Sequence, residues 1–156
     1  MVAVIGIDPG LVHTGLVRIE LLPDLRRYWV EHEVVSGINL DLIEGWCQRR
    51  PADAIFVEAY RPRSNFNTDA EMIVGVRTLV KRLGATALDN TGVKKVVGQP
   101  LMELLGAWKY STTTNHQDLR SAARIGLYGL LKDPEWNTVL ANLVKDHVDG
   151  RPWSPV

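Results

Sequence analysis

Two short apolar runs that each end in an acidic residue limit most strongly which fold this chain can adopt. Residues 2–8 read Val-Ala-Val-Ile-Gly-Ile-Asp, and residues 54–58 read Ala-Ile-Phe-Val-Glu. Runs of this length and composition are typical of central strands that are covered on both faces of a sheet. Asp8 and Glu58 would then lie at strand ends, where burial makes an unpaired carboxylate costly. Neither run contains a Lys or Arg, which favours a divalent cation as the partner of each acid.

The pattern along the rest of the chain predicts an α/β fold. Residues 14–20 and 27–35 read as two strands that form a meander with the first one, and residues 93–97 read as a fifth strand. Helices are expected at residues 39–50, 69–83 and 116–131, and from the Asp-Pro pair at 133–134 onward. A meander followed by β-α-β units predicts a mixed five-stranded sheet with helices on both faces.

Length and composition set the broad class. A chain of 156 residues fits a single domain, 1–156, in which residues 149–156 contain two prolines and are expected to form an irregular tail. The formal net charge of zero argues against a protein that coats nucleic acid by charge alone, but it allows an acidic pocket beside basic residues. The single cysteine, Cys47, excludes an intrachain disulfide, and a reducing cytoplasm is the simplest setting. The apolar run at the N-terminus is too short for a signal peptide or a membrane span.

A third acid, Asp118, lies in the first turn of the helix expected at 116–131. The small residues Ala122, Ala123 and Gly126 would let this helix approach the sheet closely and bring Asp118 to the strand ends. Three carboxylates form a hard oxygen site, which selects Mg²⁺ or Mn²⁺ over zinc.

Each acid also has a purely structural explanation. Asp8 could shape its Asp-Pro-Gly turn, Glu58 could pair with Arg61 or Arg63, and Asp118 could simply be stabilised by the helix dipole. The three acids in this strand order favour the metal site over these separate explanations.

Residues 6–17, 55–60 and 115–131 resemble, in this order, the three acidic motifs of the RuvC-like Holliday-junction resolvases, the phage-encoded members most of all. Residues 96–109 resemble the segment before the last motif, so the resemblance covers about residues 1–131. The first motif alone is moderately specific, and the ordered set is fairly specific. The resemblance implies an RNase H-like fold and a homodimeric endonuclease that cuts branched DNA, located in the host cytoplasm if phage-encoded. It also implies two Mg²⁺ ions per site, replaceable by Mn²⁺, with Asp8, Glu58 and Asp118 as catalytic ligands.

The last motif departs from the family pattern at one position. The family often carries a second acid one helical turn after the first, and here that position is Ser121. In the alternative register Asp118 is the second acid and Asn115 takes the first position. Either way one ligand is not a carboxylate, which lowers the negative charge available to a second metal ion. Two such ions would lie roughly 3.5–4 Å apart and clamp the phosphate that is cut.

Basic and aromatic residues follow Glu58 directly. Arg61 and Arg63 suit phosphate groups, and Tyr60 and Phe66 could stack on an unpaired base at a branch point. Further candidates for phosphate binding are Lys94, Lys95 and Lys109, with Lys81 and Arg82. The apolar stripe of helix 69–83 is the candidate dimer contact, unless it only covers the sheet.

Three other functions fit parts of the pattern. Actin-like ATPases and sugar kinases also open with an Asp-containing Gly turn, but they need two such domains and a second phosphate loop. A non-catalytic module that binds branched DNA would keep the fold and lose the chemistry. A nuclease of the same mechanism could instead act on forks, flaps or RNA hybrids.

Overall fold

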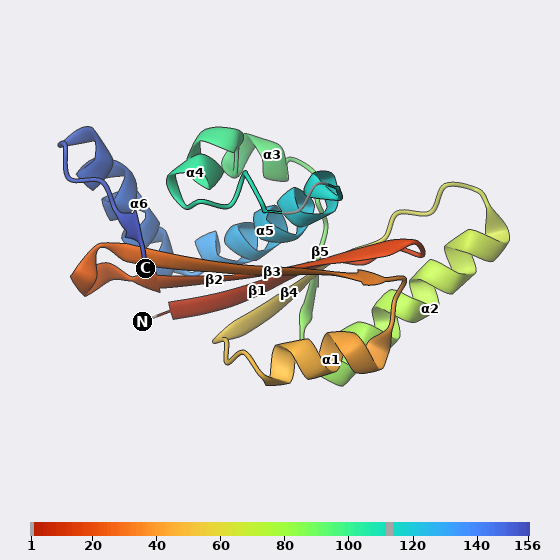
Figure 1. The fold of residues 1–156 in the computed structure, drawn as a ribbon. Coiled ribbons are helices and arrows are strands. Elements are labelled where there is room, and N and C mark those ends of the chain that lie inside the picture. Colours follow the sequence, from red (N-terminus) through yellow and green to blue (C-terminus); the bar gives the residue numbers. More distant parts are fainter. Residues whose placement is uncertain (1, 112–113) are drawn as a thin grey trace.

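The computed structural model describes residues 2–111 and 114–156, and a six-stranded mixed sheet forms its centre (Figure 1). The strands lie in the order β5-β4-β1-β2-β3-β6. Their bounds are β1 (Val2–Asp8), β2 (His13–Leu22), β3 (Arg27–Ser36), β4 (Ala54–Glu58), β5 (Thr86–Leu88) and β6 (Ser154–Pro155). The first three strands form the expected antiparallel meander, while β4 runs parallel to β1 and β5 runs parallel to β4. The predicted mixed α/β architecture is confirmed, with one strand more than expected.

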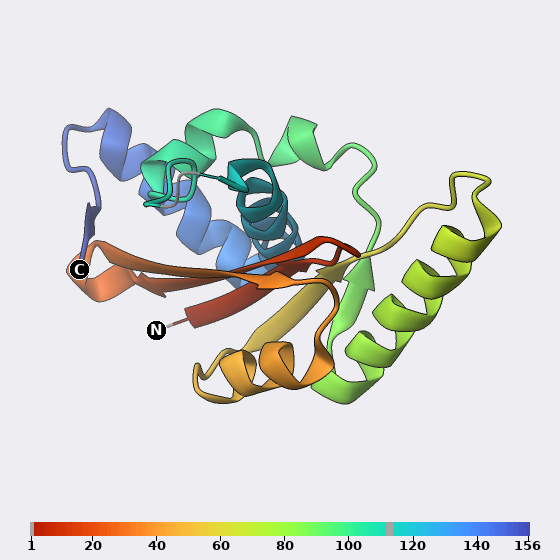
Figure 2. The same ribbon diagram turned by 45° about the vertical axis from the view of Figure 1, so that its right-hand side comes forward.

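Helices cover both faces of this sheet (Figure 2). One face carries α1 (Leu40–Gln48) and α2 (Phe66–Leu83), and the other carries α3 (Val93–Val96), α4 (Gln99–Leu104), α5 (His116–Leu131) and α6 (Pro134–Val148). A short 3-10 helix, η1 (Pro23–Leu25), links β2 to β3. Within the described residues, none of the helices combines the length and apolar character that a membrane span requires.

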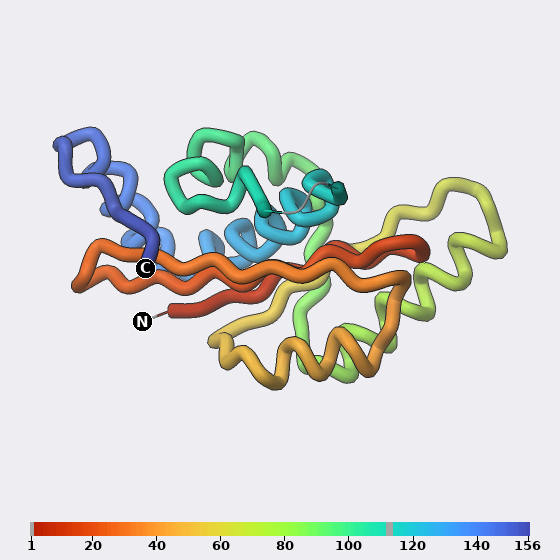
Figure 3. Tube along the Cα trace, in the orientation of Figure 1, coloured from red at the N-terminus to blue at the C-terminus, as the bar shows by residue number. Residues whose placement is uncertain are grey.

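The alternation of side chains along the strands produces two separate cores. Ile5, Ile7 and Leu16 point toward α1 and α2, while Val4 and Val17 point toward the α5 side. Both chain termini lie at one end of the sheet, and the carboxyl end of β1 lies at the other (Figure 3).

Helix α5 packs unusually close to the sheet because glycines face it. A Cβ atom added at Gly6 would lie 1.9 Å from the carbonyl oxygen of Ala122, and one added at Gly15 would lie 2.6 Å from that of Asp118. The small residues of α5 and the glycines of β1 and β2 therefore remove the side chains that would separate them. Because Gly15 pairs with Asp8 across the β1–β2 ladder, this packing brings the first turn of α5 over the end of β1.

The strand predicted at residues 93–97 is wrong, since residues 93–96 form the helical turn α3. Gly92 has a φ of 73°, a conformation that side chains disfavour, and it turns the chain into the helix. Val93 and Val97 are one turn apart, and both are buried, while Lys94 and Lys95 between them are exposed. The fifth strand is β5 instead, which is only three residues long and leaves little pattern to detect.

Two further boundaries differ from the expectation. Residues 149–156 are not irregular throughout, because Ser154–Pro155 form β6 beside the start of β3. Buried Trp153 anchors this segment, and its indole N–H donates to Asp146 at 3.0 Å. Helix α2 begins at Phe66, one turn earlier than expected, because the side chain of Asn65 accepts a hydrogen bond from the backbone N–H of Thr68 and caps the helix.

Candidate functional site

Asp8 and Glu58 lie side by side at the carboxyl ends of two neighbouring parallel strands. Ile7 pairs with Val57 in the β1–β4 register, so the residues that follow them are abreast. Both side chains are partly buried. Burial, a hydrogen bond with Glu58 and the negative charges of Glu58 and then of Asp118 together raise the pKa of Asp8 to about 9. The structure thus brings two of the three predicted ligands together, and neither acid forms an ion pair among the described residues.

Asp118 lies near this pair without joining it in one compact cluster. The start of α5 places its backbone over Gly15, opposite Asp8, and its charge acts on Asp8. Burial raises the pKa of Asp118 itself, and the nearby His13 partly offsets this effect. In the part of the chain that the structure describes, no three His, Cys, Asp or Glu side chains are close enough together to hold one metal ion. The three-carboxylate site therefore stays a prediction.

A cleft surrounds the acid pair, and we call it the strand-end cleft. It consists of two adjoining depressions of about 530 and 670 Å³. Both are lined by Asp8, Glu58, Arg61, Arg63 and Asn90. Carboxylates and cations thus share one concave surface, which suits a phosphate group that binds beside a metal ion.

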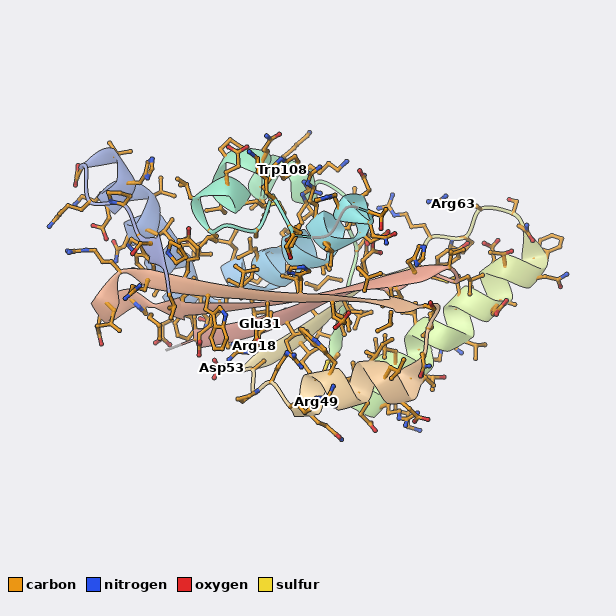
Figure 4. All side chains as sticks on the ribbon, viewed as in Figure 1. Arg18, Glu31, Arg49, Asp53, Arg63 and Trp108 are labelled. Carbon is orange, nitrogen blue, oxygen red and sulfur yellow. The ribbon has the colours of Figure 1, made fainter. Side chains whose placement is uncertain are left out.

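Most of the predicted DNA-contacting cations lie at this cleft. Arg61 lines both depressions and forms an ion pair of 2.5 Å with Asp89, whereas Arg63 lines both without an ion pair among the described residues. Lys94 and Lys95 are exposed and line the larger depression. Figure 4 labels Arg63 on the loop between β4 and α2.

The structure does not bring Lys109 to the same place. It lines a separate depression of about 390 Å³ with Glu103, Gly106 and Trp108. Lys81 and Arg82 also lie elsewhere, at the far end of α2, where Arg82 pairs with Asp41 and Glu44 of α1.

Tyr60 has a structural partner that the sequence did not indicate. Its hydroxyl donates to Asp69 at 2.6 Å, and the backbone N–H of Arg63 donates to the same carboxylate at 3.0 Å. Asp69 is only 6% exposed, and these bonds lower its pKa, the Tyr60 bond most. The buried acid thus holds the loop that carries the two arginines.

Of the two candidates for the fourth ligand position, the structure brings Ser121 to the cleft and not Asn115. Ser121 lines the larger depression together with Asp8 and Glu58. Asn115 is the residue before the first turn of α5, has a φ of 63°, and lines neither depression.

Asn90 is a residue of the site that the sequence reasoning missed. It follows β5, the strand beside β4, and its side-chain amide donates a short hydrogen bond to Glu58. Once the fifth strand is placed at residues 86–88, the polar run 89–92 lies at the carboxyl end of a parallel strand, where functional side chains gather. The sequence did not indicate this role for Asn90, because the strand was expected at residues 93–97, after Asn90 and not before it.

Comparisons with known proteins rest on structure alone. No protein-family model and no curated protein sequence matches this chain. Thermus thermophilus RuvC, solved in complex with a Holliday-junction substrate, superposes with a TM-score of 0.59 at 18% identity, over 82% of this chain and 92% of that one. The yeast mitochondrial Holliday-junction resolvase Ydc2 gives a TM-score of 0.57 at 17% identity, over 89% of this chain and 80% of that one.

A third similar structure comes from a virus. The Fowlpox virus resolvase, solved with Holliday-junction DNA, gives a TM-score of 0.50 at 10% identity, over 80% of this chain and 94% of that one. The resemblance predicted from the sequence is thereby confirmed at the level of the fold: this chain folds like the RuvC-like Holliday-junction resolvases.

Proposed function

We propose that this protein is a structure-selective endonuclease that cuts branched DNA, with Holliday junctions as the first candidate substrate and forks and flaps as further ones. One observation carries the proposal: two like-charged, partly buried carboxylates, Asp8 and Glu58, meet at adjacent strand ends inside a cleft that is also lined by arginines and lysines. Such an arrangement costs folding energy, and perturbed acids in a cleft are characteristic of sites that bind ions or substrates. The fold, shared with resolvases of low sequence identity, supports the proposal.

The donor set fits Mg²⁺, with Mn²⁺ as a substitute. Asp8 and Glu58 offer hard oxygen ligands, and a divalent ion would offset the burial and the neighbouring carboxylates that raise the pKa of Asp8. Asp118 and Ser121, from the first turns of α5, would complete the ligand set for two ions. When bound, these ions would stabilise negative charge on the phosphate and lower the pKa of the attacking water.

The chain's own residues would bind and orient the substrate. The amide of Asn90 holds one oxygen of Glu58 in place. Arg61, Arg63 and the lysines of α3 would bind backbone phosphates on either side of the acid pair. Contacts to phosphates do not depend on the base sequence, so recognition would rest on the shape of the branch.

Phe66 would recognise the branch itself. It opens α2 at the end of the loop from Glu58, and 85% of its surface is exposed. Phe66 follows Asn65, which lines the cleft, and an exposed ring can stack on a base that is unpaired at a junction, with a contribution of about 1–3 kcal/mol.

We also propose a homodimer, as the resemblance implies, that forms through α2 but not through the apolar stripe of this helix. Met72, Val76 and Leu79 of α2 are buried within the same chain, so that stripe covers the sheet. The other side of α2 exposes Val74, 61% accessible, beside an apolar groove of about 750 Å³. Sedimentation of the wild type and of Val74→Glu tests this contact, since a charge there should produce monomers.

Cleavage of a synthetic four-way junction tests the proposed activity. The wild type and Asp8→Asn are compared with Mg²⁺, with Mn²⁺ and with a chelator, on junction, fork, flap, RNA–DNA hybrid and linear duplex. We expect metal-dependent cutting of branched DNA by the wild type and none by Asp8→Asn. If both proteins bind the junction equally well and cut it equally poorly, the non-catalytic binding module is the correct function.

A further inference from the structure

Arg124 lies in the strand-end cleft, yet it is neither one of the predicted metal ligands nor one of the predicted phosphate-binding residues. It lines the larger depression together with Asp8 and Glu58, one turn of α5 beyond Ser121. Its Nε atom donates to the carbonyl oxygen of Val97 at 3.1 Å. Because Val97 is fully buried at the end of α3, this bond ties one edge of the guanidinium to a rigid part of the backbone.

The other edge of this guanidinium has no partner within the described residues. No ion pair or further hydrogen bond involves Arg124 there, whereas Arg61 in the same cleft is neutralised by Asp89. Burial lowers the pKa of Arg124 most, Glu58 and Tyr110 act in the opposite direction, and the charge of Arg120 lowers it further. A partly buried cation without a paired anion is unfavourable, and a phosphate that enters the cleft would supply the missing charge.

We propose that Arg124 is a further catalytic residue, whose two terminal nitrogens bind the non-bridging oxygens of the phosphate that is cut. This inference rests on the nuclease function proposed above. In the hydrolysis, the water oxygen forms a new bond to phosphorus, the P–O3′ bond breaks, and the proton that the water loses is balanced by the one that the 3′-oxygen gains. Arg124 keeps its own proton throughout and stabilises the negative charge that builds up on the phosphate.

Arg120 offers a matched control on the same helix. It lies one turn earlier, and its Nε atom also donates to a backbone carbonyl, that of Trp108, at 2.9 Å. Its guanidinium stacks on the Trp108 ring at 3.9 Å and lines neither depression of the strand-end cleft. Arg120→Gln and Arg124→Gln therefore remove the same charge and a similar backbone anchor, but only one of them faces the site.

Two measurements compare these variants. Single-turnover cleavage of a four-way junction with Mg²⁺ should be slowed about 10²–10³-fold by Arg124→Gln, the usual effect of losing one donor to transition-state charge. Junction binding is also measured without metal at several salt concentrations. For Arg124→Gln, the slope of the logarithm of the binding constant against the logarithm of the salt concentration should be smaller by about one, because one phosphate contact is lost. Arg120→Gln should match the wild type in both measurements. Arg124→Lys should cut at an intermediate rate, because it keeps the charge but not the planar fork.

The outcomes separate this inference from the proposed function. Equal slowing by Arg120→Gln and Arg124→Gln, or a wild-type rate for Arg124→Gln, overturns the catalytic role. If Arg124→Gln does not fold, as judged by thermal melting, a wild-type rate for Arg124→Lys overturns it instead. If the wild type binds junctions and never cuts them, the nuclease function fails. In that case the salt dependence of junction binding without metal still reports whether Arg124 contacts a phosphate.

Discussion

Two groups of buried charges on the same sheet behave in opposite ways. On β2, Arg18 is 4% exposed and pairs with Glu20 at 3.3 Å and Glu31 at 3.5 Å, while its Nε atom donates to the carbonyl of Pro51. At the end of β1, Asp8 meets Glu58 instead, and neither acid has an ion pair in the described part of the chain. Figure 4 shows Arg18 and Glu31 near each other on the α1 side of the sheet, well away from Arg63 at the cleft.

The Arg18 group alternates in sign throughout. Glu31 also pairs with Arg50 at 3.4 Å, and the guanidinium of Arg50 lies 4.4 Å from the centre of the Trp46 ring. Each buried charge therefore has an opposite charge beside it, as a group that serves the fold requires.

The contrast shows which buried charges belong to the fold and which await a ligand. Opposite charges in contact neutralise one another inside the protein. Like charges in contact destabilise the folded chain until an ion from outside binds to them, which is characteristic of functional sites. The predictions below test this distinction, with the largest expected effect first.

Catalysis should depend on the like-charged pair and not on the paired group. We expect Glu58→Gln to slow junction cutting by at least about 10²–10³-fold, because charge stabilisation at the phosphate is lost, and to leave junction binding intact. Glu20→Gln makes the same chemical change in the Arg18 group and should keep the cutting rate of the folded protein. Retained cutting by Glu58→Gln would remove Glu58 from the ligand set.

Stability should depend on the paired group. Arg18→Ala leaves Glu20 without its cation and removes one of the two cations beside Glu31, and we expect a loss of about 3–5 kcal/mol in the free energy of unfolding. The control is Arg49→Ala, an exposed arginine of the same region, which should change stability little. Chemical denaturation measures both, and equal effects of the two variants would contradict the structural role of the Arg18 group.

Replacing Asp8 with a neutral side chain should instead stabilise the metal-free protein. Folding raises the pKa of Asp8 from 3.8 to about 9. As the pH rises, the unfolded chain therefore loses this proton at a lower pH than the folded chain does. The stability that the protonated form contributes is complete below pH 4 and is lost as the pH rises toward 9. Asp8→Asn avoids this loss, and at pH 8.5 we expect it to melt about 4–8 °C above the wild type, for a gain of roughly 2 kcal/mol.

Two further conditions sharpen the Asp8 prediction. The difference in melting temperature should be smaller at pH 5, and added Mg²⁺ should stabilise the wild type more than Asp8→Asn. Equal melting temperatures of both proteins at both pH values would mean that the acid pair does not destabilise the folded protein.

The smallest effects concern the cations at the edge of the cleft. Arg63→Ala and Arg61→Ala should each weaken junction binding and reduce its salt slope by about one. We expect the affinity loss to be smaller for Arg61, because this side chain must give up Asp89 to reach a phosphate. Arg49→Ala, on the α1 side, should leave the slope unchanged. An unchanged slope for Arg61→Ala and Arg63→Ala would place these residues outside the DNA surface.

The sequence by itself determined the parts of this protein that follow local pattern. The apolar runs of β1 and β4 placed Asp8 and Glu58 at strand ends, and helical spacing placed α5 at residues 116–131, as observed. Since neighbouring parallel strands end at the same edge of a sheet, the meeting of these two acids was predictable.

The tertiary structure alone decided which distant segments became neighbours. It placed β5 beside β4 and so brought Asn90 to Glu58, turned residues 93–96 into a helix, and paired β6 with β3. It also neutralised Arg61 and Arg18, while Arg124 at the cleft has no ion pair among the residues that the structure describes. A sequence pattern reports how one segment alternates between apolar and polar residues. The state of a charge depends on which side chain of another segment lies beside it, and only packing determines that.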